Sequence, residues 1–343
     1  MRRREHWFPV VAFAAAFAAV LACGPFPSLT EPTAVGSVIP GTRVLTQDRA
    51  YYESPAWSPD GRYVAIFRNY RVSGDFIYAD TFETGPVLID LESGDHLKIP
   101  LPSSLKEGAS SGPAMWLAEG RELAFYHIDF VDGRPVPLIV RYDLESQRTE
   151  ASEVCCAPLS LEAGGSEVLV NSSSDDSFGL GWLDLETGQV VHELSLPRDE
   201  PRQHQYRDIS LSPDARTLLL GAADGVIYRY AIGSGEPPVP FVSSAASPAW
   251  SPDGSKVVYV SLPANGDYYN GQLMIANADG SSPEPLFSEP QPRGMLSPAW
   301  SPDGTQMAFL YGTEHSNRLL VVEIPERLRP TGAFPAPPSK ALQ

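Results

Sequence analysis

Several residues in this sequence belong to types that support catalysis or metal binding, but their spacing fits neither chemistry. After His6 the histidines stand far apart and without paired ligand spacing, at His96, His127, His192, His204 and His315. The carboxylates that could act together as acid and base are Asp175 with Asp176 and Asp129 with Asp132. Nothing in the sequence brings either pair into one pocket. We therefore predict no catalytic residues, no metal and no cofactor.

An aspartate also recurs in the tetrapeptide Ser-Pro-Asp-Gly, at Asp60, Asp253 and Asp303. A turn accounts for every residue of this motif. Serine suits its first position, proline presets φ at the second, and glycine accepts the left-handed conformation. We therefore predict that these aspartates shape hairpin turns and do not bind a ligand.

The turns belong to a repeat that occurs six times. Ser-Pro-Ala-Trp-Ser-Pro-Asp-Gly begins at Ser54, Ser247 and Ser297, and weaker copies begin at Gly112, Pro158 and Asp208. The tryptophan position falls at intervals of 59, 45, 50, 39 and 50 residues, a spacing typical of propeller blades, at Trp57, Trp116, Leu161, Leu211, Trp250 and Trp300. Each copy is followed by a second hairpin, such as the one around Asp90–Gly94. Six copies of four strands predict an all-β chain of six blades.

The phrase Trp-Ser-Pro-Asp-Gly followed by a β-strand resembles the PD40 (WD40-like) repeat of TolB-like β-propellers and of prolyl oligopeptidase propeller domains. The resemblance covers about residues 42 to 328, and three copies match in full. The others depart from it, with Leu161 and Leu211 in place of tryptophan and Ala215 in place of glycine. The resemblance implies a six-bladed β-propeller that binds partners through one face. TolB has a further N-terminal domain that this chain lacks, so its specific partners are not carried over.

The two ends of the repeat region predict how the ring closes. A strand-like piece around Val44 has no local hairpin partner, while the last repeat shows only three clear strands, the third around Leu320. Pairing these two segments completes the sixth blade and leaves no unprotected edge. We thus expect a propeller over residues 37–329, closed by an N-terminal strand. We expect a disordered tail over residues 330–343, which carry no apolar pattern.

The N-terminus has the features of a bacterial lipoprotein signal. Arg2, Arg3 and Arg4 precede an apolar run too short for a comfortable membrane crossing. The run ends in Val-Leu-Ala-Cys, which resembles the lipobox cleaved by the lipoprotein signal peptidase. This implies a signal peptide over residues 1–22 and lipid attachment at Cys23. Residues 23–36 are rich in proline, serine and threonine and are expected to form a tether.

The net charge and the cysteines indicate which partners and which redox compartment to expect. The formal net charge is −17, and removing the first 22 residues leaves 22 basic and 41 acidic residues, or −19. Such a surface repels phosphate backbones, so nucleic acid is not an expected partner. Cys155 and Cys156 are adjacent in a chain expected to enter an oxidising compartment. They form either a strained vicinal disulfide or two packed thiols.

The connections between second and third strands vary in length, and loops of this kind carry function on rigid scaffolds. Two of them place aromatic residues beside acidic ones and form the candidate binding site. Its residues are Tyr70, Asp75, Phe76, Tyr78, Asp267, Tyr268 and Tyr269. Packing of each loop on its own blade is the alternative interpretation of these aromatics.

Taken together, the sequence favours a non-enzymatic binding module on the outside of a bacterial membrane. We expect it at the outer membrane of a Gram-negative host, or otherwise on the outer leaflet of the cytoplasmic membrane. Its partner would be an envelope protein, a peptide or a polysaccharide. The alternative function is a carbohydrate-active hydrolase or lyase that uses the central pocket of the propeller.

Overall fold

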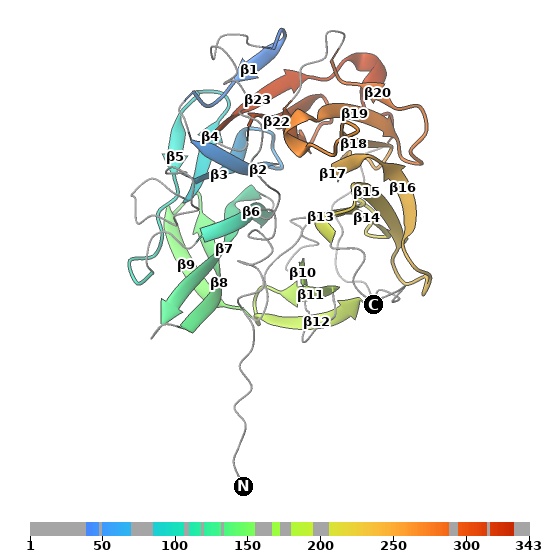
Figure 1. Cartoon of the computed structure of the whole chain (residues 1–343). Coiled ribbons are helices and arrows are strands. Elements are labelled where there is room, and N and C mark those ends of the chain that lie inside the picture. Colours follow the sequence, from blue (N-terminus) through green and yellow to red (C-terminus); the bar gives the residue numbers. More distant parts are fainter. Residues whose placement is uncertain are drawn as a thin grey trace, which may run out of the picture.

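The computed structural model describes residues 39–47, 50–69, 85–105, 110–117, 120–131, 134–154, 167–171, 180–194, 206–287, 294–313 and 316–332. They form six antiparallel sheets around a central axis, which confirms the predicted six-bladed β-propeller (Figure 1). The described residues also include two 3₁₀ turns, η3 (Tyr268–Asn270) and η4 (Glu326–Leu328). Within these ranges we find no helix with the length and hydrophobicity needed to cross a bilayer.

The strands follow the order of the repeats, and in blades one, two, four and five the first strand of the sheet lies nearest the axis (Figure 1). Blade one contains β2 (Tyr51–Trp57), β3 (Tyr63–Asn69), β4 (Gly85–Asp90) and β5 (His96–Lys98). Blade two contains β6 (Ser110–Leu117), β7 (Glu122–Val131), β8 (Arg134–Asp143) and β9 (Arg148–Glu153). The described part of blade three contains β10 (Glu167–Asn171), β11 (Leu180–Asp184) and β12 (Gln189–Leu194). Blade four contains β13 (Tyr206–Leu211), β14 (Thr217–Ala222), β15 (Val226–Ala231) and β16 (Val239–Ser243). Blade five contains β17 (Ala245–Trp250), β18 (Lys256–Ser261), β19 (Gln272–Asn277) and β20 (Glu284–Pro285). Blade six contains β21 (Met295–Trp300), β22 (Gln306–Gly312), β23 (Asn317–Glu323) and β1 (Thr42–Val44).

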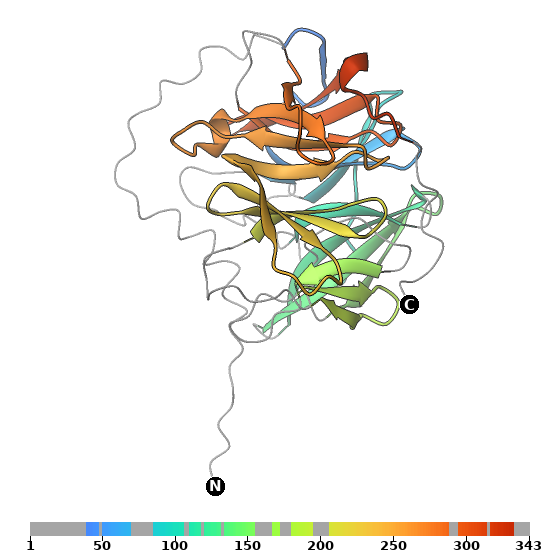
Figure 2. The same ribbon diagram turned by 90° about the vertical axis from the view of Figure 1, so that its right-hand side faces the viewer.

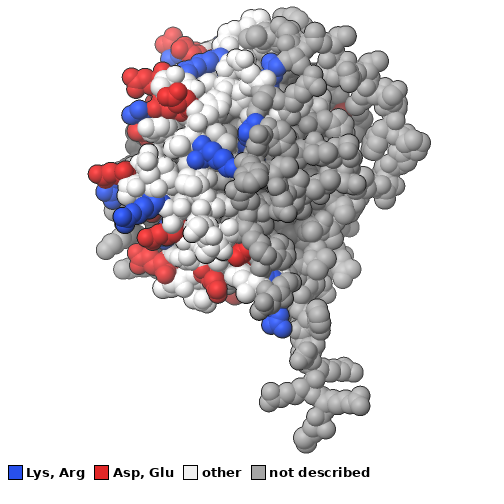
Figure 3. All heavy atoms as spheres, turned by 90° about the vertical axis from the view of Figure 1, so that its left-hand side faces the viewer, with Lys and Arg blue, Asp and Glu red and all other residues white. Residues whose placement is uncertain are grey.

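Burial explains the composition of the strands. The middle strands are apolar on both faces because a neighbouring blade covers each face; Val64, Ala65, Ile66 and Phe67 of β3, for example, are fully buried. The outer strands β5, β9 and β12 are largely exposed. On the flank that carries β5 and β9, acidic and basic side chains are interspersed, without a large area of one sign among the described residues (Figure 3).

The Ser-Pro-Asp-Gly segments form the turns expected of them. In blade one, Ser58 Oγ donates to Asp60 Oδ1 and accepts from Tyr63 N at 2.8 Å, while Arg62 N donates to Asp60 Oδ1 at 3.0 Å. Gly61 completes the turn with φ of 73°. The same bonds recur in blades four, five and six. We call the side of the ring that carries these turns the turn face, and the opposite side the loop face.

The ring closes as the sequence predicted. β1 pairs antiparallel with β23, with Thr42 opposite Val322 and Val44 opposite Leu320. Because β23 runs towards the turn face, the antiparallel β1 starts at that face and runs towards the loop face. Leu45 N then donates to Leu319 O at 2.8 Å, which extends the pairing by one bond. The first strand of the chain therefore supplies the outer strand of the last blade.

Neighbouring blades are joined by indole hydrogen bonds. Trp116 Nε1 donates to Ala56 O at 3.2 Å, Trp57 Nε1 to Ala299 O at 3.0 Å, and Trp300 Nε1 to Ala249 O at 3.2 Å. In each case the tryptophan of one blade reaches the inner strand of the preceding blade. Each bond gives a partly buried indole N–H a partner and links two neighbouring blades.

The last described residues still contact the propeller, whereas the sequence analysis placed them in a tail. η4 lies at the turn face (Figure 2, red), and Leu328 is buried. Pro330 then packs on Gly304, Thr331 N donates to Ser255 Oγ at 3.1 Å, and Gly332 N donates to Asp253 Oδ2 at 2.5 Å. Residues 330–332 thus cross from blade six to the turn of blade five. Residues 333–343 lie outside the described ranges.

Candidate functional site

The most distinctive polar cluster lies on inner strands at one repeat position. This position is three residues before the tryptophan position and holds Ser54, Asp208, Ser247 and Ser297 in blades one, four, five and six. The three serines have φ of 52°, 48° and 47°, and each lies at a break in the register between the first and second strands. Left-handed backbone at non-glycine residues is unfavourable by ~1–3 kcal/mol each and is frequent at functional sites. All four residues lie on the first strands of their repeats, β2, β13, β17 and β21.

Asp208 and Ser247 connect blades four and five. Ser247 N donates to Asp208 Oδ2 at 3.0 Å, and Ser247 Oγ approaches the same oxygen at 3.3 Å. Gly221 of β14 lies opposite Asp208 and leaves room for it, because a Cβ at Gly221 would lie 3.3 Å from Asp208 Oδ2 and from Pro248 Cδ. Asp208 is the acidic residue at a position where the full repeats have serine.

Tyr268 completes this cluster from the loop face. Its hydroxyl hydrogen-bonds with Ser247 Oγ at 2.5 Å and also interacts with Ser297. Because Ser247 Oγ donates to the Asp208 carboxylate, the order of donation runs from Tyr268 to Ser247 to Asp208. Burial raises the pKa of Tyr268 well above its usual value, and the Asp208 charge acts in the same direction. Tyr268 therefore keeps its proton at neutral pH and serves as a donor.

Two further tyrosines lie beside Tyr268. Tyr269 contacts it edge to face, with ring centroids 5.8 Å apart and planes at 82°. Burial raises the pKa of Tyr51, which lies on β2 beside Tyr269 and Glu53. We call Tyr51, Asp208, Ser247, Tyr268, Tyr269 and Ser297 the pore-mouth cluster. It contains aromatic rings, hydroxyl groups and a carboxylate, and Ser247 and the Tyr268 hydroxyl within it are largely buried.

Asp267 has a structural role in the same loop. Its Oδ1 accepts from Tyr269 N at 3.0 Å and caps η3, while its Oδ2 accepts from Asn270 Nδ2 at 2.9 Å. Both carboxylate oxygens are therefore occupied within the loop. The structure thus brings together three residues of the predicted binding site, Asp267, Tyr268 and Tyr269, and packs the two tyrosines against the junction of blades six and one.

The other predicted site residues fall outside the described ranges: Cys23, Tyr70, Asp75, Phe76, Tyr78, Cys155 and Cys156. Sequence reasoning overlooked Tyr51, Asp208, Ser247 and Ser297. Aligning the repeats by column would have revealed Asp208, because an acid stands there in place of serine.

Among the described residues, we find no second centre built from other residues that could do chemistry. Within the described residues there is no group of three or more metal-binding side chains. His127 of β7 is fully buried, and burial lowers its pKa. Ser110 stands in a Gly-x-Ser-x-Gly stretch at 108–112, but it begins strand β6, whereas a hydrolase nucleophile occupies a strand-to-helix turn.

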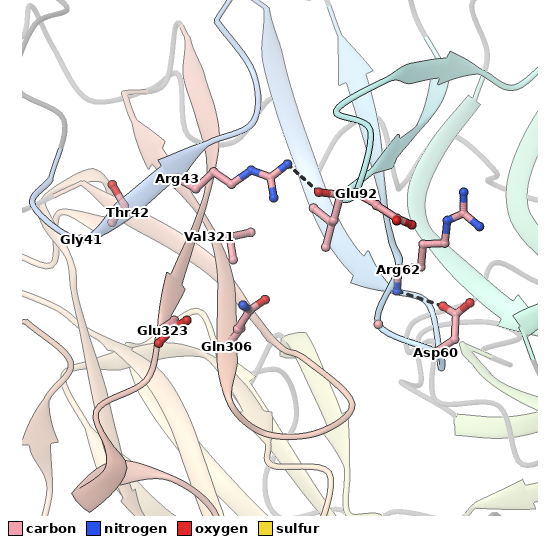
Figure 4. A pocket seen from close by; sticks show the side chains of 11 residues that line it. Gly41, Thr42, Arg43, Asp60, Arg62, Glu92, Gln306, Val321 and Glu323 are labelled. Atoms are coloured by element: carbon pink, nitrogen blue, oxygen red, sulfur yellow. Dashed lines mark hydrogen bonds between the residues drawn. The ribbon is translucent and has the colours of Figure 1, made fainter.

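A groove of about 670 Å³ lies on the turn face where blade six meets blade one (Figure 4). Its lining includes Arg43, Asp60, Arg62, Glu92, Gln306 and Glu323. Arg43 donates to Leu91 O at 2.7 Å, and Arg62 binds Asp90 Oδ2 through two nitrogens, at 2.8 and 3.1 Å. Because both arginines already have partners and the lining carries both signs of charge, the groove has no strong preference for a charged ligand.

Comparison with known proteins identifies no family for this chain. No protein-family model matches the sequence, and no curated protein sequence matches it. Solved structures with a similar fold include oligogalacturonate lyase in complex with manganese, with a TM-score of 0.49 and 14% identity over 83% of this chain and 80% of that one. They also include the β-propeller domain of Cps50 (Swd1) from Myceliophteria thermophila, with a TM-score of 0.47 and 15% identity over 79% and 82% of the two chains. A third is the β-propeller domain of the Trilobed protease from Pyrococcus furiosus, with a TM-score of 0.46 and 16% identity over 80% of this chain and 83% of that one. The named neighbours are a lyase and two β-propeller domains, one of them from a protease.

Proposed function

We propose that this chain is a TolB-like β-propeller that is tethered to a bacterial membrane and binds an envelope protein, peptide or polysaccharide through its loop face. The pore-mouth cluster is the observation that supports this proposal most directly. Its aromatic rings offer contact area at a low entropic cost, and its hydroxyl groups and carboxylate offer directional hydrogen bonds. Such a surface suits a basic or hydroxyl-rich ligand group.

The chemistry of the cluster favours binding over catalysis. Raised pKa values keep Tyr51 and Tyr268 protonated at neutral pH, so neither serves as a general base. Asp208 Oδ2 accepts from Ser247 N at 3.0 Å and from Ser247 Oγ at 3.3 Å. A carboxylate in this place offers acceptor oxygens to a ligand.

The direction of β1 is consistent with a tether. The chain enters the propeller at the turn face, because Thr42 pairs with Val322 near the end of β23. A lipid on Cys23 would hold the protein by the turn-face side, and the tether would leave the loop face free for partners. Localisation on the outer side of a bacterial membrane is part of the same proposal.

Capture of partners from the native envelope tests the role of the cluster. The full-length protein should lose its partner when Asp208 is changed to Asn, a substitution that removes the charge and keeps the shape. The same change at Asp279, in an exposed turn of blade five, is the matched control and should leave capture intact. Each variant is first shown to unfold at the temperature of the original protein.

Retained capture by a folded variant carrying both Asp208→Asn and Tyr269→Ala would refute the assignment of the site. Release of shortened products from envelope polysaccharides, measured in the same preparations, would replace the binding proposal with a carbohydrate-active enzyme.

A further inference from the structure

The connection between β18 and β19 contains two Asn-Gly dipeptides, Asn265-Gly266 and Asn270-Gly271, on either side of Tyr268 and Tyr269. In this dipeptide the backbone nitrogen of the glycine can attack the amide carbon of the asparagine side chain, because glycine has no side chain to hinder the approach. Such an attack needs an exposed, activated amide and room for a five-membered ring. The structure gives the two asparagines different surroundings in both respects.

Asn265 meets these needs. It is exposed in a turn. Gly266 N donates to Pro263 O at 2.8 Å, and this bond must open before the nitrogen attacks; Gly271 N is held in the same way, by Tyr268 O at 3.3 Å. Asn265 Oδ1 accepts from Asp267 N at 3.2 Å, which folds the side chain over the backbone nitrogen of Gly266 and polarises the amide carbonyl towards attack. A Cβ placed on Gly266 would meet no atom within 4 Å. The space needed for ring closure is therefore open.

Asn270 lacks both features. Its Nδ2 donates to Asp267 Oδ2 at 2.9 Å, so a carboxylate holds the amide in place and adds electron density to it. Gly271 lies against β18, where a Cβ would overlap Val260 Cγ1 and would approach Met295 O to 3.5 Å. This packing restricts the backbone movement that ring closure requires.

We propose that Asn265 is a site of spontaneous deamidation beside the pore-mouth cluster, and that the fold protects Asn270. Gly266 N bonds to Asn265 Cγ, the bond from Cγ to the amide nitrogen breaks, and ammonia leaves with the proton from Gly266 N. Water then opens the cyclic imide at either carbonyl, which yields aspartate or isoaspartate. Both products add a negative charge two residues before Asp267. Isoaspartate also adds a carbon to the backbone and displaces the residue that caps η3. This inference does not depend on the proposed function.

Peptide mapping of the folded, full-length protein tests the proposal. Both asparagines lie in one tryptic fragment, residues 257–293, so their rates can be compared within a single peptide. After incubation at mildly alkaline pH in ¹⁸O-labelled water, the label should enter position 265 several-fold faster than position 270. In urea the two rates should become similar, because unfolding removes the contacts that distinguish Asn265 from Asn270.

Asn265→Gln is the control variant, because its longer side chain disfavours the five-membered ring, and it should take up no label at position 265. Equal or faster conversion of Asn270 in the folded protein would overturn the proposal. Absence of conversion at Asn265 while the urea sample converts would overturn it as well.

Discussion

The side-chain amide of Asn317 pairs with the backbone of Tyr52 in both directions. Tyr52 N donates to Asn317 Oδ1 at 2.7 Å, and Asn317 Nδ2 donates to Tyr52 O at 2.9 Å. The two residues are 265 positions apart, and Asn317 is only 2% exposed. The side-chain amide thus makes the pair of hydrogen bonds that a neighbouring strand would make. It joins blade six to the inner strand of blade one, next to the pairing of β1 with β23.

We expect Asn317→Asp to destabilise the whole propeller. An aspartate cannot donate to Tyr52 O, and its charge would be buried. Losing the donor alone costs about 1–3 kcal/mol, and the buried charge adds to this cost. Urea unfolding would show a lower midpoint. Asn277→Asp is the matched control, because that half-buried side chain accepts from Lys256 Nζ at 2.8 Å and tolerates a charge. Equal stability of the two variants would contradict the role given to Asn317.

Removing the Tyr268 hydroxyl should weaken the fold slightly. Tyr268→Phe deletes the bond to Ser247 Oγ and leaves the ring in place, so we expect a loss of about 0.5–1.5 kcal/mol in unfolding free energy. Tyr63→Phe keeps the stacking of that ring on Trp116 and should change stability by less than about 0.5 kcal/mol. Thermal unfolding of both variants compares the two effects. A Tyr268→Phe protein as stable as the original would show that the bond contributes nothing.

Two truncations of the C-terminus should differ in their effect on stability. Ending the chain after Arg329 removes the contacts of Thr331 with Ser255 and of Gly332 with Asp253. Two hydrogen bonds at ~0.5–1.5 kcal/mol each predict a measurably lower unfolding temperature. Ending the chain after Gly332 keeps both bonds and should leave that temperature unchanged. If both truncations behave like the full chain, the docking of residues 330–332 has no stabilising effect.

Acid should destabilise the protein through His127. Burial lowers the pKa of this histidine in the folded state, and the nearby Asp129 opposes the shift to a smaller extent. The unfolded chain therefore takes up its proton first, so stability is complete above about pH 6.5 and falls as the pH drops below it. Aspartates such as Asp90, whose pKa is lowered by its hydrogen bond with Arg62, contribute at more acidic pH.

The measurement is the unfolding free energy between about pH 7 and pH 5. His127→Gln should flatten its slope, while His192→Gln, in the exposed strand β12, should not. An unchanged slope in the His127 variant would exclude this histidine as the cause.

Membrane attachment is tested by Cys23→Ser. The lipid on Cys23 would be the apolar anchor after signal cleavage, so the variant should move from the membrane fraction to the soluble fraction. Ser28→Ala in the tether is the control and should stay with the membrane. Full membrane retention of the Cys23 variant would contradict the lipoprotein proposal.

The repeats made the fold predictable in some detail. The pairing of Val44 with Leu320 followed from an unpaired strand at one end and an incomplete blade at the other. The Ser-Pro-Asp-Gly turns followed from local backbone preferences. The turns depend on short-range preferences that recur in each copy of the repeat, whereas the ring closure followed from counting the strands at the two ends of the repeat region.

The candidate site was harder to infer because it depends on contacts between blades. Asp208 meets Ser247 only where blades four and five pack together, and 39 residues separate them. The sequence placed Tyr268 correctly in a loop but could not show that its hydroxyl turns inward onto Ser247. Residues 330–332 dock through backbone N–H groups, which leave no signature in the side-chain pattern.

The direction of β1 also sets the mechanical behaviour of the ring. Thr42 and Val322 are partners near the turn face, so tension applied between the two chain ends acts on one end of the β1–β23 pairing. The strands would then peel apart one hydrogen bond at a time, and this geometry resists force far less than sliding does. A load that enters from a partner on the loop face and leaves through the N-terminal segment would instead pull β1 lengthwise along β23. The propeller is thus expected to hold firmly between a tether and a loop-face partner, and to open easily when both of its ends are pulled.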